Sequence, residues 1–471
     1  MREDILRPLL AVAVLAAGLA GCATFHSQPI SPAQTAGAFN ARSLSNENLR
    51  AFLETNRVAA PGAREPWDLK ALTLAAFYYQ PALAEARAEL AAAQAARITA
   101  GERPNPSVSV TPGYDNGIPG NPSPWLVPLT TDWPIETAGK RRKRVAQADH
   151  LAEAARWNLA GTVWQVRSHV RAAVLSLYIA RETQSLTARQ VMAQSNVVRL
   201  LEGQVSAGNI SGYEVTQARV ALDTARLAWQ DAAGQYRQAR VQLANALGAP
   251  EQALDGVEVS FAGLEEFPRE LTQPEVRRQA LLNRPDVLGA LAEYAARQSA
   301  LQLEIANQYP DVHLGPGYAW NAGSAADNQW NLGLTVTLPV LNHNQGPVAE
   351  AQARRTQAAA RFLAVQANAI GEISSALAGY REALRQTETA RSLLEHLRRR
   401  LASVRAQVEA GEAGTLAAAN AEVEYSIGAQ NELATRVKAQ QALGQLEDAV
   451  QSPLTLPPAT LHAAENEAAS K

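Results

Sequence analysis

The chain has 471 residues, a formal net charge of −2 and a single cysteine. The near-neutral charge gives no reason to expect a nucleic acid as partner, and a lone cysteine excludes an internal disulfide framework. Hydrophobic residues make up 47% of the chain. Beyond the N-terminus, no apolar run approaches the roughly 20 residues that a membrane helix needs, so a membrane-crossing part would have to consist of strands.

Residues 1–21 have the pattern of a signal peptide. Arg2 and Arg7 precede an apolar run that is too short to span a membrane, and the run ends in Leu-Ala-Gly directly before Cys22. This ending resembles the lipobox of bacterial lipoproteins, in which the cysteine becomes the lipidated first residue. By the same resemblance, Ala23 after the cysteine favours sorting to the outer membrane. The alternative is an ordinary signal peptide with a chance cysteine near its cleavage site.

The segment that follows, residues 22–66, is rich in Ser, Pro, Ala and Asn and shows only weak periodicity. We expect it to form a lipidated linker that is ordered only by its partners. From residue 67 to residue 101 the apolar residues recur at helical spacing, with Pro81 as a break.

Two stretches, residues 105–114 and 125–133, alternate between apolar and other side chains, which predicts two strands. A helical pattern with apolar steps of three and four, typical of coiled-coil packing, then runs over residues 140–205. Gly208 marks a turn, and a returning helix is expected over residues 212–247.

The same pattern restarts after a mixed connector, residues 251–273, which indicates an internal repeat. Landmarks of the two halves recur at a nearly constant spacing: Pro81 and Pro285, Pro106 and Pro310, Gly113 and Gly317, Trp125 and Trp330, and Gly208 and Gly411. Each half therefore predicts helix, strand, strand, long helix, turn and helix. In the second half, strands are expected at 311–320 and 329–338 and helices at 346–409 and 415–450.

These patterns divide the chain into six predicted parts. They are a signal peptide (1–21), a lipidated N-terminal linker (22–66), a first repeat (67–250), a connector (251–273), a second repeat (274–451) and a disordered tail (452–471).

The four predicted strands carry a physical constraint. Four strands cannot close a barrel, and open sheet edges are not tolerated in lipid, so several chains must share one barrel. The alternative, a soluble sandwich, is disfavoured because helices of about 100 Å do not fit a compact domain. Tryptophans in or at the ends of the strands resemble the aromatic girdle of outer-membrane barrels. They are Trp125, Trp133, Trp320 and Trp330.

Two motifs carry a resemblance to a known family. Residues 136–141, Glu-Thr-Ala-Gly-Lys-Arg, resemble the Gly-Lys-Arg start of the long helix in the TolC-type outer-membrane factor family. Residues 338–346, Leu-Pro-Val-Leu-Asn-His-Asn-Gln-Gly, resemble the Pro-Leu-Phe-Asn-Arg-Asn-Gln-Gly signature of its heavy-metal (CzcC-like) branch, with His343 in place of arginine. With the duplicated architecture, the resemblance covers essentially the whole mature chain.

The resemblance implies a mainly α fold with a small membrane β part. Three chains would form a twelve-stranded β-barrel continuous with a long periplasmic α-helical barrel. Such a homotrimer would be the lipid-anchored outer-membrane channel of a tripartite efflux system in a Gram-negative bacterium. Its partners would be a periplasmic adaptor (membrane fusion protein), an inner-membrane pump of the RND type and outer-membrane lipid. Heavy-metal cations or drugs would be the substrates. Two alternatives stay open, the outer component of a type I protein secretion system and a periplasmic structural coiled-coil lipoprotein.

Site residues follow from the strand alternation and from the resemblance. The small polar residues expected in the barrel lumen are Ser107, Ser109, Thr111, His313, Asn331, Thr335 and Thr337. The resemblance implies that two helical tips dock the adaptor and close the tunnel, although the same residues also suit two ordinary loops. The tip residues are Gly208, Asn209, Ile210, Ser211, Gly411, Glu412, Gly414 and Thr415.

A selectivity gate is expected close to these tips. Family members commonly place acidic residues six and nine positions after the tip glycine, where this chain has Glu214 and Gln217 in the first repeat and Ala417 and Asn420 in the second. Glu214, tripled by symmetry, would attract cations. Its alternative is a solvated surface charge. The gate candidates are therefore Glu214, Gln217 and Asn420.

Other chemistry is not expected from the sequence. The basic run at residues 140–144 suits either anionic lipid headgroups or a solvated helix start. Seven scattered histidines, none at ligand spacing, predict no metal site. With no nucleophile motif, phosphate loop or carboxylate pair, we expect no catalytic residues, no cofactor and no enzyme activity. Energy for transport would then come from the pump.

Overall fold

The computed structural model describes residues 24–59, 61–62, 65–114, 125–265, 267–268, 273–321 and 328–454. The predicted signal peptide, Cys22 and most of the predicted tail lie outside the described residues. The chain divides into two units, Met1–Arg42 and Ser43–Lys471. In the first unit, α2 (Pro32–Asn40) begins at a proline, whose fixed φ suits the first turn of a helix.

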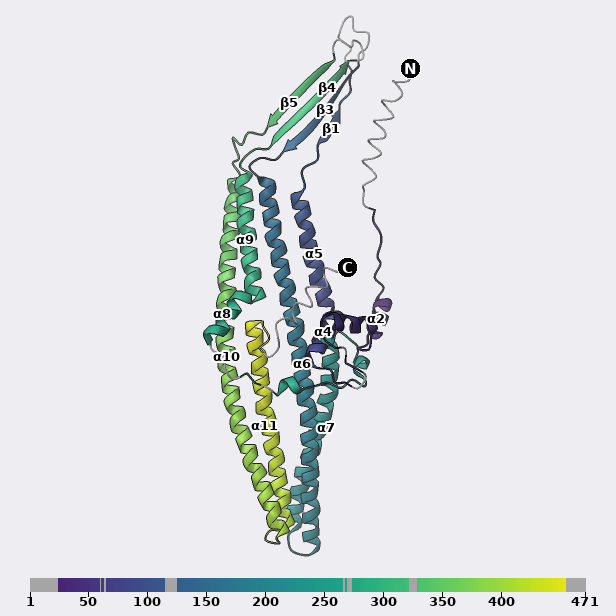
Figure 1. Ribbon diagram of the computed structural model, residues 1–471, viewed down its shortest axis with the longest axis vertical. Coiled ribbons are helices and arrows are strands. Elements are labelled where there is room, and N and C mark those ends of the chain that lie inside the picture. Colours follow the sequence, from purple (N-terminus) through teal and green to yellow (C-terminus); the bar gives the residue numbers. More distant parts are fainter. Residues whose placement is uncertain are drawn as a thin grey trace. The chain divides into compact units, whose positions relative to one another are not determined.

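The second unit is built from long helices and one small sheet (Figure 1). Its main elements are α3 (Glu47–Thr55), α4 (Leu69–Tyr79), α5 (Pro81–Gly101), β1 (Ser107–Val110), β2 (Gly113–Tyr114), β3 (Trp125–Ile135), α6 (Lys140–Ser206), α7 (Gly212–Leu247), α8 (Gln273–Asn283), α9 (Pro285–Ala306), β4 (Val312–Asn321), β5 (Gln329–Val336), α10 (Gln345–Glu409) and α11 (Thr415–Val450). Short 3₁₀ helices, η1 (Glu251–Leu254) and η2 (Ala262–Leu264), occupy the connector. Among the described residues, no helix has the length and apolarity to cross a membrane.

The sheet is antiparallel, with strand order β1-β3-β4-β5. The short strand β2 pairs with β3 in the same register as β1 does. β1 and β2 are therefore two pieces of one edge strand. Thr111 lies between them and its N–H still donates to the carbonyl of Pro128. One edge of the sheet is therefore β1 with β2, and the other is β5.

The six longest helices of the second unit, α5, α6, α7, α9, α10 and α11, lie side by side in a single layer. Helix α6 packs against α5 and α7 on one side and against α9 and α11 on the other, and α10 packs against α9 and α11. The order across the layer is thus the α5/α7 column, then α6, then the α9/α11 column, then α10. The α5/α7 column and α10 form its two edges, under β1 and β5 respectively (Figure 1).

Each column is joined end to end by the residue that precedes a proline. The side chain of Gln80, before Pro81, donates to the carbonyls of Asn245 and Ala246 at the end of α7, at 2.9 and 2.7 Å. Arg284, before Pro285, donates in the same way to the carbonyl of Ala449 at the end of α11, at 2.6 Å. Both contacts satisfy carbonyls that a helix end leaves without an intrahelical partner.

The prediction of a linker over residues 22–66 is wrong for the second half of this segment. That half contains α3, which packs into the core. Asn46 caps this helix by accepting from the N–H groups of Asn48 and Leu49, at 2.9 and 3.2 Å. Leu49 and Leu53 are fully buried in the cluster that also holds α4, the middle of α6 and the end of α7. A helix of two and a half turns shows only Leu49, Phe52 and Leu53 at helical spacing, too few residues for a periodic signal.

Candidate functional site

The sheet has one polar and one apolar face. Residues paired directly across antiparallel strands point to the same face. The register aligns Ser109 with Thr130, Thr130 with Gly317, and Gly317 with Asn331. By this register, the polar face holds Ser107, Ser109, Thr130, Asp132, His313, Asn331 and Thr335. The five predicted lumen residues that lie within strands thus share one face, and Thr111 and Thr337 lie just outside the strands.

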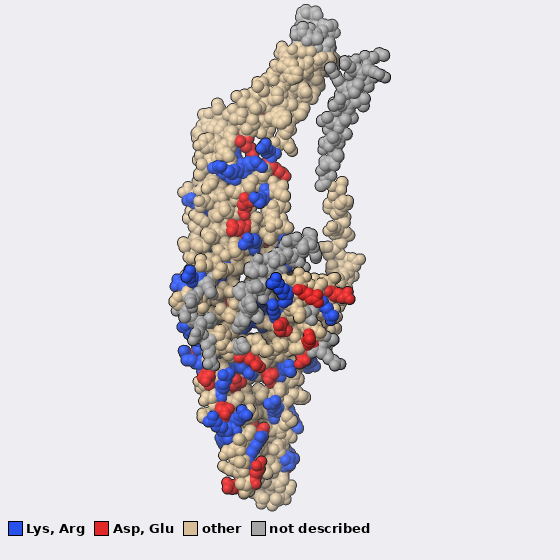
Figure 2. Space-filling model, in the orientation of Figure 1, with Lys and Arg blue, Asp and Glu red and all other residues tan. Residues whose placement is uncertain are grey.

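The opposite face is apolar and uncovered in the single chain. Its members include Val108, Val110, Leu129, Trp133, Trp320, Trp330, Leu332 and Leu334. Trp330 is 82% exposed and Leu332 is 75% exposed. In the view of Figure 2, the strands show no charged side chain, whereas the helices carry both signs. Thr131 is a polar residue on this face, and its hydroxyl donates a hydrogen bond to the carbonyl of Pro316 at 2.9 Å. An exposed apolar surface of this extent indicates contact with lipid or protein.

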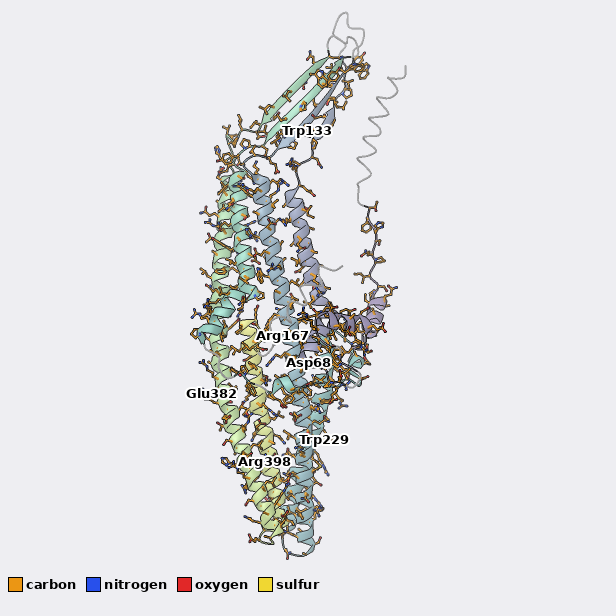
Figure 3. All side chains as sticks on the ribbon, in the orientation of Figure 1. Asp68, Trp133, Arg167, Trp229, Glu382 and Arg398 are labelled. Atoms are coloured by element: carbon orange, nitrogen blue, oxygen red, sulfur yellow. The ribbon has the colours of Figure 1, made fainter. Side chains whose placement is uncertain are left out.

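Aromatic pairs lie where the strands run toward their connecting loops. The rings of Tyr114 and Trp125 meet edge to face with centroids 5.2 Å apart, and those of Tyr318 and Trp330 lie 4.6 Å apart. Trp133 lies nearer the helices on β3 (Figure 3). Aromatic side chains at both ends of an apolar strand surface are typical of membrane β-strands.

The basic run at residues 140–144 has a role that neither sequence interpretation anticipated. Lys140 is buried, and its Nζ lies 2.7 Å from Oδ1 of Asp311, which also accepts from the N–H of Thr137 at 2.9 Å. Burial raises the pKa of the Asp311 carboxyl, but the hydrogen bonds from Lys140 and Thr137 and the charges of Lys140 and His313 outweigh it and hold that pKa below its usual range. The start of α6 is therefore anchored to the foot of β4.

Two further residues of this run anchor the end of α5. Arg141 donates to the carbonyl of Gly101, and Arg144 donates to that of Ala100 and forms an ion pair with Glu136. The signature motif at residues 338–346 has the equivalent position in the second half. The side-chain amide of Asn344 donates to the carbonyl of Glu304, at 2.8 Å, close to the end of α9. Both motifs that carry the family resemblance thus hold the corners between sheet and helices.

The two helical tips have the same backbone geometry. At the end of α6, the N–H of Gly208 donates to the Val205 carbonyl and that of Asn209 to the Gln204 carbonyl. At the end of α10, Gly411 donates to Val408 and Glu412 to Gln407 in the same way. Gly208 and Gly411 have φ values of 76° and 78°, in the left-handed region that this Schellman motif requires.

An apolar cluster joins the two tips to each other. Its buried members are Val197, Val198, Leu201, Val215, Ala218, Leu222 and Ala419, from both hairpins. The predicted gate residues lie outside this cluster. Glu214, Gln217 and Asn420 are all exposed, and Gln217 donates to the hydroxyl of Tyr213 at 2.8 Å. The single chain does not gather them into one site.

A buried charged group between α6 and α11 was missed by the sequence reasoning. Arg167, labelled in Figure 3, donates twice to Oε2 of Glu447 at 3.1 Å, and Nε of Arg171 lies 3.2 Å from the same oxygen. Arg171 also donates to Gln440. The pKa of Arg171 is lowered, chiefly by burial, while Glu447 opposes the shift. The partners stand 280 residues apart for Arg167 and Glu447, so no local pattern could have predicted them.

No cluster of three or more metal-ligating side chains occurs within the part of the chain that the structure describes. Nδ1 of His313 lies at hydrogen-bond distance from Asp132, and the backbone N–H of His343 donates to Gln345.

The fold and these sites define a class of protein. The sequence profile of the family described as Outer membrane efflux protein matches the chain twice, over residues 76–249 and 276–450. The two matches make up well over half of the chain, and the chain belongs to this family.

Two relatives of known name are similar in sequence. The chain is 29% identical to the cobalt-zinc-cadmium resistance protein CzcC of Cupriavidus metallidurans over 231 residues, which cover 49% of this chain and 54% of CzcC. It is 25% identical to the pyoverdine export outer membrane protein OpmQ of Pseudomonas aeruginosa over 319 residues, covering 62% of this chain and 67% of OpmQ. The chain thus spans about half the length of CzcC and about two thirds of the length of OpmQ.

Solved structures share the fold. The outer membrane protein VceC from Vibrio cholerae superposes with a TM-score of 0.66 at 18% identity, covering 81% of this chain and 95% of VceC. The outer-membrane channel OprN gives a TM-score of 0.66 at 18% identity, covering 92% of this chain and all of OprN. The mainly helical fold with a small β part is therefore confirmed as TolC-like.

Proposed function

We propose that three copies of this chain form the outer-membrane exit duct of a tripartite efflux system. The observation that carries the proposal is the single-layer arrangement with two unlike, open edges. A contact between unlike edges closes into a ring when the rotation between copies allows it. Three chains of four strands, with β1 and β2 counted as one, would give twelve strands and leave no open edge in lipid.

The two faces of the sheet support the same assembly. In a closed barrel one face meets lipid and the other meets the bore. The apolar face, with Trp330 and Leu332 exposed, suits lipid, and the polar face with Ser109 and Thr335 suits water. A barrel of twelve strands is wide enough for an aqueous lumen, because barrel diameter grows with strand number.

The helical edge supports it as well. Helix α7 exposes an apolar stripe with a seven-residue spacing, made of Tyr213, Val220 and Leu227, with Val241 fourteen residues further on. Such a seam is the pattern by which one helix packs against a partner helix. Within one chain α7 packs mainly against α6, with smaller contacts to α4 and η1, and the stripe stays exposed. The stripe is therefore suited to α10 at the opposite edge of the next copy. Exposed Leu393 on α10 offers apolar surface for that contact.

The other end of the helices is proposed to dock the periplasmic adaptor and to close the duct. The tips at Gly208 to Ser211 and at Gly411 to Thr415 project beyond the apolar cluster that joins them. In a trimer Glu214 would be present three times near the mouth and would attract cations. We propose Gln217 and Asn420 as its uncharged neighbours in the gate, and Cys22 as the lipid anchor.

The class of substrate is proposed from the similarity of the chain to its relatives. Similarity to CzcC and the signature at residues 338–346 favour divalent metal cations, supplied by an inner-membrane pump of the RND type. Similarity to OpmQ, a pyoverdine export protein, makes organic compounds the second candidate. A type I protein secretion role remains the alternative within the family.

Conductance of the purified protein in planar bilayers tests the duct, with Leu334→Pro as the disrupting variant. A proline at position 334 removes a ladder hydrogen bond of β5, either within the chain or toward the next copy. We expect discrete channels and a trimeric mass for the wild type, and loss of both in Leu334→Pro. Leu338→Pro, just beyond β5, is the matched control and should keep both. A trimer and channels that survive Leu334→Pro would contradict the proposal.

A further inference from the structure

The polar face of the sheet holds one pair of titratable side chains among its described residues, Asp132 on β3 and His313 on β4. Nδ1 of His313 lies 3.0 Å from both carboxylate oxygens of Asp132. The two side chains are 49% and 37% exposed, so the pair is open to solvent from this face. The other described members of the face are uncharged: most are serine, threonine, asparagine, glutamine or glycine, and the rest are leucine, proline and alanine.

Charged groups next to the pair are already neutralised by permanent cations. Asp311, two residues before His313, is bound to Lys140 from the start of α6. Glu136, at the corner after β3, is paired with Arg144. Strand β5 brings only the uncharged Thr335 against His313. Among the described residues at this end of the sheet, Asp132 is therefore the carboxylate whose partner is an imidazole and not a permanent cation.

We propose that Asp132 and His313 form a charge filter at the end of the barrel next to the helices, which favours cations while the His313 imidazole is neutral and loses that preference when it is protonated. The inference rests on the proposed function, because the pair acts on permeating ions only if the polar face lines a bore. It adds a second selectivity element, at the opposite end of the helices from Glu214.

The charge arithmetic gives the direction of the effect. With neutral imidazole the pair carries −1 per chain, or −3 for three chains, and with protonated imidazole it carries zero. Imidazole changes its charge between about pH 5 and 8, within the range of bilayer experiments. The ring acts over roughly 10 Å at 0.1 M salt and about 30 Å at 0.01 M, so the preference should be strongest at low salt and vanish near 1 M.

The contributions of the helical tips and of the sheet to ion selectivity are distinguished by changing the pH on one side of the bilayer only. The reversal potential is measured in a potassium chloride gradient at low salt, while the compartment on the strand side is shifted from about pH 8 to about pH 5. We expect a severalfold fall in the potassium-to-chloride permeability ratio of the wild type. His313→Gln should keep the cation preference and lose its pH response. Asp132→Asn should weaken the preference at both pH values.

Further variants keep the result interpretable. Asp132→Glu retains the charge and should retain the preference, which separates charge from folding. Val108→Ile, on the apolar face, should behave as the wild type, and Glu214→Gln should keep the response to pH on the strand side. Channels whose selectivity is the same in wild type, His313→Gln and Asp132→Asn would overturn the filter and leave the duct in place. Absence of channels in the wild type would overturn the proposed function and the filter with it.

Discussion

The two halves of the second unit, residues 76–249 and 276–450, share one order of elements but satisfy the same local needs with different side chains. At the column junctions, an amide from Gln80 serves α7 and a guanidinium from Arg284 serves α11. After these helices, Gly248 and Gln451 both adopt a left-handed conformation, with φ of 73° and 52°. The geometry of a helix end thus requires a donor and a left-handed residue, and leaves the residue types open.

The two halves differ more in the residues that pack around their column junctions. In the first half, α3, α4 and the connector add a large apolar cluster around the junction, with Leu49, Leu72 and Phe77 almost fully buried. In the second half a smaller cluster under α8 holds Tyr380, Ile373 and Leu443, and charged groups around Arg284 complete the junction. We infer that the first half is the more rigid of the two.

The largest expected effect compares the two cores. Leu243 and Leu446 occupy corresponding positions on α7 and α11, and both have no exposed surface. Replacing either by alanine leaves a cavity that costs about 2–5 kcal/mol of unfolding free energy. We expect Leu243→Ala to cost more, because the shell of α3 and α4 hinders collapse around it. Urea unfolding followed by circular dichroism measures both, and equal losses would remove the distinction between the halves.

The next largest effect on stability is expected from replacing the side-chain donors at the column junctions, Gln80 and Arg284. Arg284→Ala removes a nearly buried cation that bonds Ala449, Asp286 and Glu372, and we expect a loss of about 2–3 kcal/mol. Gln80→Ala removes two neutral hydrogen bonds and should cost about 1 kcal/mol. Arg284→Gln, which copies the first half, should recover part of the loss. Thermal unfolding of the three variants ranks them, and a Gln80→Ala loss above that of Arg284→Ala would reverse the comparison.

A pH dependence distinguishes the starts of the two long helices. α6 begins at the Lys140–Asp311 ion pair, whereas α10 begins with the uncharged amide of Asn344. Since the pKa of Asp311 lies below its usual range, its stabilising contribution is present at neutral pH and is lost as the pH falls through that lowered pKa. Wild type should therefore lose more stability on acidification than Asp311→Asn. Unfolding curves for both across acidic pH decide it, and parallel losses would exclude the pair as a cause.

Substitutions at the two left-handed residues, Gly248 and Gln451, are expected to change the stability in opposite directions. A Cβ on Gly248 would lie 3.1 Å from the carbonyl oxygen of Tyr79, so Gly248→Ala should cost about 1–2 kcal/mol or more. Gln451→Gly relieves left-handed strain, and we expect a gain below about 1 kcal/mol, because glycine also gains freedom in the unfolded chain. Melting temperatures of both variants test the contrast. A stabilised Gly248→Ala variant would contradict the close approach.

The smallest effect concerns two ion pairs of reversed polarity. Glu202 on α6 pairs with Arg219 on α7, and at corresponding positions Arg405 on α10 pairs with Glu422 on α11. Both pairs are exposed, so each contributes about 0.2–1 kcal/mol. The double reversal Glu202→Arg with Arg219→Glu should restore what either single change removes. A double-mutant cycle at low and high salt measures this coupling, which should shrink at high salt.

The strands, their faces and the helix ends could be predicted because their signals are local. Alternation in residues 329–338 assigns each side chain to a face, and Gly208 and Gly411 end their helices by a backbone requirement. Asp132 and Thr130 were missed as polar-face members, because β3 was interpreted from its tryptophans and apolar residues alone. The Lys140–Asp311 and Arg167–Glu447 pairs join residues 171 and 280 positions apart, and their formation depends on helix packing that no local pattern encodes. The gate and lumen assignments depend on neighbouring copies and stay predictions.

The central claim is that β1 of one copy pairs with β5 of the next until three copies close the ring, and disulfide cross-linking tests it most directly. Ser109→Cys is combined in turn with Gln329→Cys, Asn331→Cys, Gly333→Cys and Thr335→Cys, and the single variants control for Cys22. A disulfide forms only when the two Cα atoms lie within about 7 Å of each other, so a bond between copies reports strand pairing. We predict that at least one combination, oxidised in membranes, gives a covalent ladder that stops at three chains. A ladder that stops at two, one that continues beyond three, or no cross-link in any combination would contradict the account.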